Sequence, residues 1–174
     1  MSITIVATPA ATTANSYLSE ADAITRLANS WHGPAWTAME GEDRKRLLLV
    51  ATERIDRETA WQGSPSLYDQ ALAWPRVNTY SPNGLLLPGG TIPELILAMT
   101  AELAGYLAAW LKDNTGLDPF ALPGELGSIG SMGGVGLSFG MRGDAIPAGE
   151  HYYRNSIRPK LAALLELSPR LVRG

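Results

Sequence analysis

The segment from Leu95 to Leu111 constrains the fold more than any other part of the sequence, because it is apolar on nearly every side. Large apolar side chains at helical spacing form one face, and alanines with one glycine form the opposite face. A helix that is apolar all round is normally buried all round. The sequence therefore predicts a helix from Pro93 to about Lys112 that is central to the domain or partly covered by a neighbouring subunit.

Membrane insertion of this segment is not expected. Its 17 residues are at the lower limit for a membrane span, and Glu102 lies near its middle. The first residues, Met1–Thr4, lack the basic and apolar regions of a secretory signal, and the chain has no cysteine for disulfides or thiolate metal sites. We expect assembly inside the cell.

Three further segments have helical patterns. A first helix is expected to begin at Ser19, whose hydroxyl can cap it, and to end at Trp31–Pro34 because proline disfavours helical dihedrals in the residue before it. Residues 42–58 have apolar positions at spacings of three and four, which predicts an amphipathic second helix. Apolar residues at helical spacing recur between Tyr153 and Leu165 and predict a C-terminal helix.

Two segments are rich in glycine or proline. Residues 61–91 are expected to form a long ordered loop, held to the core by four large side chains. These are Trp61, Tyr68, Leu72 and Trp74. Residues 124–143 are glycine-rich and almost uncharged, and Gly133–Gly134 could turn a β-hairpin arm. An isolated hairpin is marginal in water, so we expect subunit contacts through its apolar residues. These are Ile129, Val135, Leu137 and Phe139.

The predicted fold class is mainly α: a small bundle of about four helices with a glycine-rich β-hairpin arm and a C-terminal helix. We expect one domain over residues 1–174, since a chain of this length needs only one core. Its parts are an extended arm (1–13), a helical core (14–112), a loop with the hairpin (113–150) and a C-terminal docking segment (151–174).

No enzyme is predicted, and no cofactor or metal. Residues 136–140 match the G-x-S-x-G nucleophile motif at Ser138, with Asp144 and His151 following in hydrolase order. That motif needs a buried strand before the serine and a helix after it, and the glycines here fit a hairpin better. A hydrolase at Ser138 stays a third hypothesis. His32 and His151 are the only histidines and have no partners at metal-ligand spacing.

One aromatic and basic cluster could bind nucleic acid or protein. It comprises Tyr152, Tyr153, Arg154, Arg158 and Lys160. Such clusters can stack on bases while the cations follow phosphates. The chain has a net charge of -3, although residues 142–174 hold 6 bases against 3 acids. Because an acidic domain repels nucleic acid elsewhere, an acidic protein partner is the favoured interpretation.

Several sequence blocks together resemble a family of phage proteins often labelled DnaT-like single-stranded-DNA-binding proteins. The resemblance covers about residues 14–112, and the C-terminal helix also fits. The blocks are Ala14–Ala23, Ala51–Asp56, Gln70–Arg76 and Ile92–Pro93 at the start of the alanine-rich helix. The glycine-rich stretch is longer than the family pattern. In phage genomes these proteins resemble head-tail connector or head-completion proteins.

This resemblance implies a ring of about twelve copies beneath the portal that joins capsid to tail in the virion, after synthesis in the bacterial cytoplasm. The implied partners are like copies, the portal, a tail-side completion or terminator protein, and double-stranded DNA that slides through the lumen. From the residues, we expect the C-terminal segment to lay its apolar face in a portal groove, with cations at the rim. The predicted interface is Tyr153, Arg154, Ile157, Arg158, Lys160, Leu161, Leu164 and Leu165.

Trp74, Pro75 and Arg76 are expected to pin the loop: the tryptophan buried, the proline fixing the backbone and the arginine pairing with a carboxylate.

The alternative function, from a different class, is a single-stranded-DNA-binding replication accessory protein. Salt-sensitive binding of oligonucleotides would distinguish the two, since phosphate contacts weaken steeply as salt rises.

Overall fold

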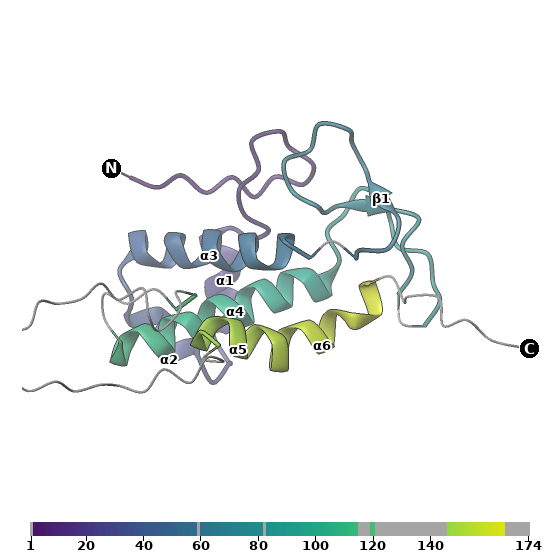
Figure 1. Cartoon of the computed structure of the whole chain (residues 1–174). Helices are drawn as coiled ribbons and strands as arrows, with labels where there is room; N and C mark the ends of the chain where they lie inside the picture. Colours follow the sequence, from purple (N-terminus) through teal and green to yellow (C-terminus); the bar gives the residue numbers. More distant parts are fainter. Residues whose placement is uncertain (1, 59, 82, 115–118, 121–145, 166–174) are drawn as a thin grey trace, which may run out of the picture.

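The computed structural model describes residues 2–58, 60–81, 83–114, 119–120 and 146–165, and within them the chain is mainly helical (Figure 1). The small, mainly α fold predicted from the sequence is confirmed. The elements in chain order are α1 (Glu20–Leu27), α2 (Gly33–Ala38), α3 (Gly41–Asp56), β1 (Ser64–Pro65), β2 (Arg76–Val77), α4 (Glu94–Asp113), α5 (Ala148–Tyr152), the π-helix η1 (Tyr153–Ile157), α6 (Arg158–Leu161) and the 3₁₀ turn η2 (Ala162–Leu164).

Helix α4 is the centre of the molecule, as its all-round apolar pattern predicts. It contacts α1, α2, α3, η1 and α6. Its buried positions include both faces, from Ile96 and Leu103 on one side to Ala101, Ala104 and Ala108 on the other. The alanines let the neighbouring helices approach closely. By length and composition alone α4 could also cross a membrane, a test that the core helices of many soluble proteins pass.

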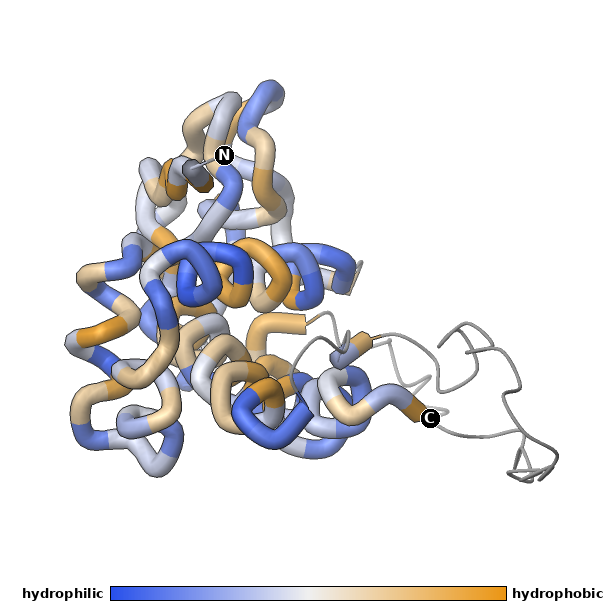
Figure 2. Tube along the Cα trace, turned by 90° about the vertical axis from the view of Figure 1, so that its left-hand side faces the viewer, coloured by the Kyte–Doolittle hydropathy of each residue, from blue (hydrophilic) through white to orange (hydrophobic). Residues whose placement is uncertain are grey.

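Helices α1 and α3 pack on α4 with one face and present their charged face outward. Figure 2 shows hydrophilic and hydrophobic positions alternating along the helices. Ser19 caps α1 as predicted, accepting a hydrogen bond from the Asp22 amide at 3.1 Å. Helix α2 was not predicted. Pro34 lies in its first turn, where a missing amide costs nothing, so this proline begins a helix as well as ending the one before it.

Three of the sequence blocks that carry the family resemblance meet at one point in the structure. The Tyr17 hydroxyl donates to the Asp56 carboxylate, and the amide of Ala73 donates to the same oxygen at 2.7 Å. Burial, and then the negative charge of Asp56, raises the pKa of Tyr17 well above its ordinary value. Two blocks far apart in sequence are thus bound to the third at the end of α3, which gives all three a structural role.

The N-terminal arm is docked along the domain. Asn15 accepts from the Val6 amide at 2.8 Å and donates to the Thr4 carbonyl at 2.9 Å, and Glu42 of α3 accepts from the Ile3 amide at 2.8 Å. These bonds replace the backbone pairing that a sheet would give an extended segment. They explain why a short arm of small residues is held at all.

Residues 60–92 form the predicted long ordered loop, which lies at one end of the helices (Figure 1). It contains the antiparallel β1–β2 pair, with Ser64 opposite Val77, and single antiparallel bridges join Tyr80 to Leu86 and Trp61 to Leu165. Trp61 and Trp74 are buried and contact edge to face, with ring centroids 5.6 Å apart. The expectation that Tyr68 also pins the loop is wrong, because its side chain is fully exposed.

The Trp74–Arg76 block holds the loop as predicted. Trp74 is buried, and the bond between it and Pro75 is cis. The Arg76 guanidinium donates to three backbone carbonyls, those of Gln62 at 2.7 Å, Gly63 at 2.7 Å and Ala73 at 3.2 Å. These bonds satisfy loop carbonyls that have no partner in a strand ladder, and so hold the backbone of the loop in place.

Candidate functional site

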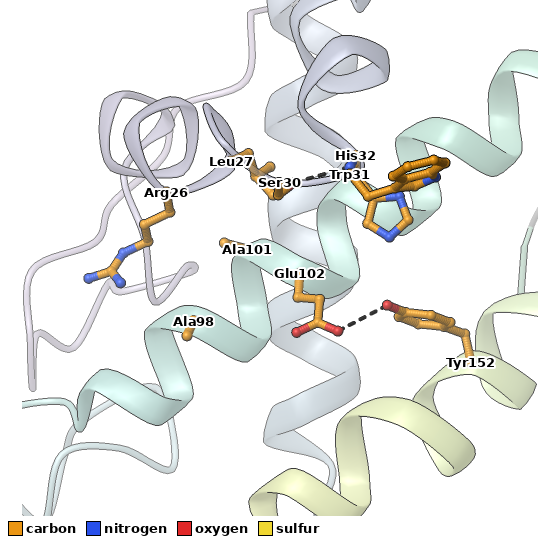
Figure 3. Close-up of a pocket in the computed structure, with 9 residues that line it drawn as sticks. All are labelled: Arg26, Leu27, Ser30, Trp31, His32, Ala98, Ala101, Glu102 and Tyr152. Atoms are coloured by element: carbon orange, nitrogen blue, oxygen red, sulfur yellow. Dashed lines mark hydrogen bonds between the residues drawn. The ribbon is translucent and has the colours of Figure 1, made fainter.

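A cleft of about 680 Å³ lies between the end of α1, the middle of α4 and α5 (Figure 3). It is bounded by the turn that joins α1 to α2 on one side and by Tyr152 on the other. Its lining mixes apolar, aromatic and charged side chains. These are Arg26, Leu27, Ser30, Trp31, His32, Ala98, Ala101, Glu102 and Tyr152.

Trp31 is the most unusual residue of this cleft, since its side chain is 95% exposed. Helix α1 ends at Leu27, and the tight turn that follows carries Trp31 away from the α1 stripe. The turn is fixed from within: the Ser30 side chain accepts from the His32 amide at 3.1 Å, and the Ser30 carbonyl accepts from Gly33 at 3.1 Å. A large aromatic ring held in water by an ordered turn is typical of a binding surface.

His32 lies behind Trp31 and seals the wall of the cleft. Its ring contacts Tyr106 and Tyr152 edge to face, with centroids 6.0 and 6.2 Å away. Gly105 of α4 permits this approach, because a Cβ there would lie 3.0 Å from the His32 Cβ and 3.0 Å from Leu27. Burial lowers the pKa of His32 despite the opposing charge of Glu102, so the imidazole is neutral at pH 7.

Tyr152, at one side of the cleft, is stacked on Tyr106 and has a half-buried polar end. Tyr106 and Tyr152 are parallel within 3°, with ring centroids 3.8 Å apart. The Tyr152 hydroxyl donates to Glu102 at 3.0 Å, and Lys160 donates to both oxygens of that carboxylate at 2.7 and 2.8 Å. Burial and then Glu102 raise the pKa of Tyr152. Both tyrosines are therefore neutral, and the aromatic wall carries no charge of its own.

This arrangement suits a flat ring better than it suits catalysis or a metal. Its aromatic groups offer a face to stack on, and its charged groups are already paired: Arg26 with Glu94, and Lys160 with Glu102. Among the described residues no group of histidine, aspartate and glutamate side chains could hold a metal ion. Ser138 and Asp144 of the G-x-S-x-G hypothesis lie outside the described residues, and His151 is exposed on α5.

The C-terminal segment, predicted to dock on a portal through its apolar face, uses that face inside the subunit. Its five apolar interface residues are all buried in the core. They are Tyr153, Ile157, Leu161, Leu164 and Leu165. Helical spacing correctly identified the face, but it already packs on α4 within the core. Docking by that face would require the segment to leave the core, so the predicted mode of docking is wrong for the subunit as folded here.

The three cations of the same segment pair within the chain. Arg154 contacts Glu150 at 2.6 Å, Arg158 contacts Glu58 at 3.1 Å, and Lys160 contacts Glu102. The two aromatic residues of the cluster are also engaged, because Tyr152 stacks on Tyr106 and the Arg54 guanidinium lies 3.6 Å above the Tyr153 ring centre. The five residues therefore do not form one stacking platform, contrary to the nucleic-acid hypothesis for this cluster.

The predicted hairpin interface at Ile129, Val135, Leu137 and Phe139 lies outside the described residues. The loop of residues 60–92 is where the described chain exposes apolar side chains in number. They are Leu67, Tyr68, Tyr80, Leu85 and Leu86. The sequence did not indicate this exposure, because the same residue types that pin a loop can also project from it.

The fold and the cleft define a class: a small, mainly helical protein with an ordered loop and an exposed aromatic group beside a cleft. The model of the family described as "Putative DnaT-like ssDNA binding protein" matches residues 1–115, which include α1 to α4 and the whole loop. The chain belongs to this family. No curated protein and no solved structure matches it. The family description favours the DNA-binding alternative over the connector function.

Sequence reasoning missed Trp31 as a site residue. It interpreted Trp31–Pro34 only as the end of the first helix and gave the tryptophan no role. The hydrogen bonds that close the turn and leave Trp31 exposed are not visible in helical spacing.

Proposed function

We propose that this chain binds single-stranded DNA, with a base stacked on Trp31 at the mouth of the cleft. The single observation that carries the proposal is the 95% exposure of an indole held by an ordered turn beside a cleft that His32 and Tyr152 also line. Every base has a face that can stack, and such stacking is worth about 1–3 kcal/mol per base. The family description supports the same class of ligand.

The charges of the site determine what kind of DNA binding is expected. Arg26 and Lys160, the cations nearest the cleft, are paired with Glu94 and Glu102, and the chain as a whole has a net charge of -3. Few cations are therefore available to release counterions from phosphates. We expect stacking to supply most of the affinity, and we expect a weak dependence on salt and on base sequence.

The test is the affinity of a short fluorescent oligothymidylate measured by anisotropy for the wild type, Trp31→Ala and Tyr68→Ala. Tyr68 is the matched control, since it is an equally exposed aromatic residue on the loop. We expect Trp31→Ala to weaken binding about 5-fold to 150-fold, in proportion to one lost stack, and Tyr68→Ala to leave it unchanged. Equal losses, or no binding by the wild type, would refute the proposal.

A second candidate function is the ring-forming head-tail connector subunit of a tailed phage. The observation that favours it is the set of apolar side chains that the loop exposes, chiefly Leu85 and Leu86. Side chains of that kind are unfavourable in water and are commonly covered by like copies or by another protein. On this proposal the subunits form a ring, of about twelve copies by the resemblance, that binds portal and tail proteins at the virion's head-tail junction, without catalysis and with DNA sliding through the lumen.

The connector proposal is tested by mass measurement of the purified chain alone and with a portal. We expect a ring or a portal complex for the wild type, and loss of both for Leu85→Ser with Leu86→Ser. The control is Ile24→Ser, another exposed apolar residue, placed on α1. A chain that stays monomeric with portal present would refute this candidate while leaving the DNA-binding proposal intact.

A further inference from the structure

A second charged cluster lies where the C-terminal segment packs on α3, apart from the cleft. Arg54 of α3 forms a two-pronged pair with Glu150, through its Nε at 2.6 Å and its Nη2 at 2.8 Å, and its Nη1 is 3.8 Å from Glu58. Arg154 also bonds Glu150, and Arg158 also bonds Glu58. Each carboxylate is thus shared by two arginines.

The cluster is unbalanced in charge, with three guanidinium groups against two carboxylates. Arg54, Glu150 and Glu58 form its inner part, with side chains only 15%, 15% and 13% exposed. Arg154 and Arg158 form its outer part and are 58% and 50% exposed. The surplus positive charge therefore lies on the surface, where an anion can reach it.

The two outer arginines are also only partly engaged. The bond from Arg154 to Glu150 and the bond from Arg158 to Glu58 both use Nε. Within the described part of the chain, the terminal nitrogens of these two guanidiniums donate no hydrogen bond. An arginine offers five N–H donors in a fixed fork, and the outer edge of that fork matches a phosphate.

Local helix geometry places the two arginines on one side of the segment. Arg154 lies in the π-helix η1 and Arg158 follows one turn later, at the start of α6. Residues four apart on a helix are neighbours, about 5–6 Å between Cβ atoms, so two guanidiniums can reach the same anion. Short π-helical turns inside α-helices recur at functional sites.

We propose that Arg154 and Arg158 form a phosphate-binding site, backed by Arg54 and its two glutamates. The inner ion pairs hold the outer guanidiniums in place without neutralising them completely, so the site is organised before the phosphate binds. The phosphate is that of a DNA backbone or of a small phosphorylated molecule. The first of these sources rests on the proposed function, whereas the second does not.

The DNA arm of the test compares salt dependence. Anisotropy titrations with the same oligothymidylate at several salt concentrations are made with the wild type, with Arg154→Gln/Arg158→Gln and with the control Arg46→Gln/Arg57→Gln. The control removes one arginine of α3 and the arginine that follows its last residue; both are even more exposed and also paired. We expect the slope of log affinity against log salt to fall by about 0.7 for the site variant, the amount for one lost phosphate contact, and to stay unchanged for the control.

Folding is not at risk in the site variant, because Arg54 remains to pair with both carboxylates. Equal changes of slope in the two variants would mean general charge attraction and would overturn the proposal of a site. No binding by the wild type would remove the DNA source and the proposed function together, and the second arm then decides whether the phosphate site exists.

The second arm uses inorganic phosphate itself. Thermal unfolding is measured in phosphate and in chloride at equal ionic strength and pH. We expect phosphate to raise the Tm of the wild type and of the Arg46/Arg57 control, and to leave that of the Arg154/Arg158 variant unchanged. The same rise in all three proteins would overturn the site. A polyglutamate peptide that stabilises the wild type as strongly as phosphate would also overturn it, in favour of an acidic protein partner.

Discussion

The C-terminal segment (146–165) and the loop (60–92) contain similar apolar residues and put them to opposite uses. In the segment, Ile157 and Leu161 are buried in the core where η1 and α6 contact α4. In the loop, Leu85 and Leu86 are exposed. The difference is that helical spacing gathers apolar residues on one face that a neighbouring helix can cover, whereas an irregular loop projects them in several directions. The loop and Trp31 are therefore where the proposed functions seek a partner surface.

Removing the C-terminal segment is expected to have the largest effect on the stability of the fold. A chain that ends at residue 150 loses the side chains of Tyr153, Ile157 and Leu161 from the core and exposes α4. The docking hypothesis drawn from the sequence required such a chain to stay folded. We expect instead that it loses cooperative unfolding in urea, as followed by circular dichroism. A sharp transition like that of the full chain would show that the segment is an appendage.

Single substitutions sharpen the same contrast. Leu161→Ala leaves a cavity in the core and should lower the free energy of unfolding by about 2–5 kcal/mol. Leu85→Ala removes the same atoms from an exposed position and should change it by less than about 0.5 kcal/mol. Urea denaturation of both variants beside the wild type measures the difference. Equal effects would mean that the loop residues are covered in solution.

A smaller effect is expected from pH at the ion pairs that hold the segment. The hydrogen bonds from Arg54 lower the pKa of Glu150 in the folded state. A carboxyl with a lowered pKa stabilises the fold above its unfolded value of about 4.3, and this stability is lost as pH falls through the folded value. Glu150→Gln should therefore make the unfolding free energy fall less steeply below about pH 5. An unchanged pH profile would show that the pair is not formed in solution.

The helices were predictable because their causes are local. Periodic apolar residues located α3 and α4 to within about two residues, and the Ser19 hydroxyl marked the start of α1. The central position of α4 was predictable because its side chains are apolar on nearly every side of the helix. Such patterns are properties of a short stretch of sequence, so no knowledge of the rest of the chain was needed.

What could not be predicted depends on contacts between distant residues. From the sequence, Arg154 and Arg158 were interpreted as cations available to a partner. Their ion pairs with Glu150 and Glu58 form only when the chain folds. The meeting of Tyr17 with Asp56 likewise needs the whole domain. The sequence does not distinguish the exposed Tyr68 and Trp31 from aromatic residues that are buried. The course of the folded backbone decides which of these side chains are exposed.

The central claim is that Trp31 is the residue that meets a base. Five tryptophans give five indole N–H signals in a nitrogen-15 NMR spectrum, which serve as internal probes. On titration with oligothymidylate we expect the Trp31 signal to shift while those of the buried Trp36 and Trp74 stay in place. A Trp31 signal that does not move, at oligonucleotide concentrations that saturate any binding, would contradict the account.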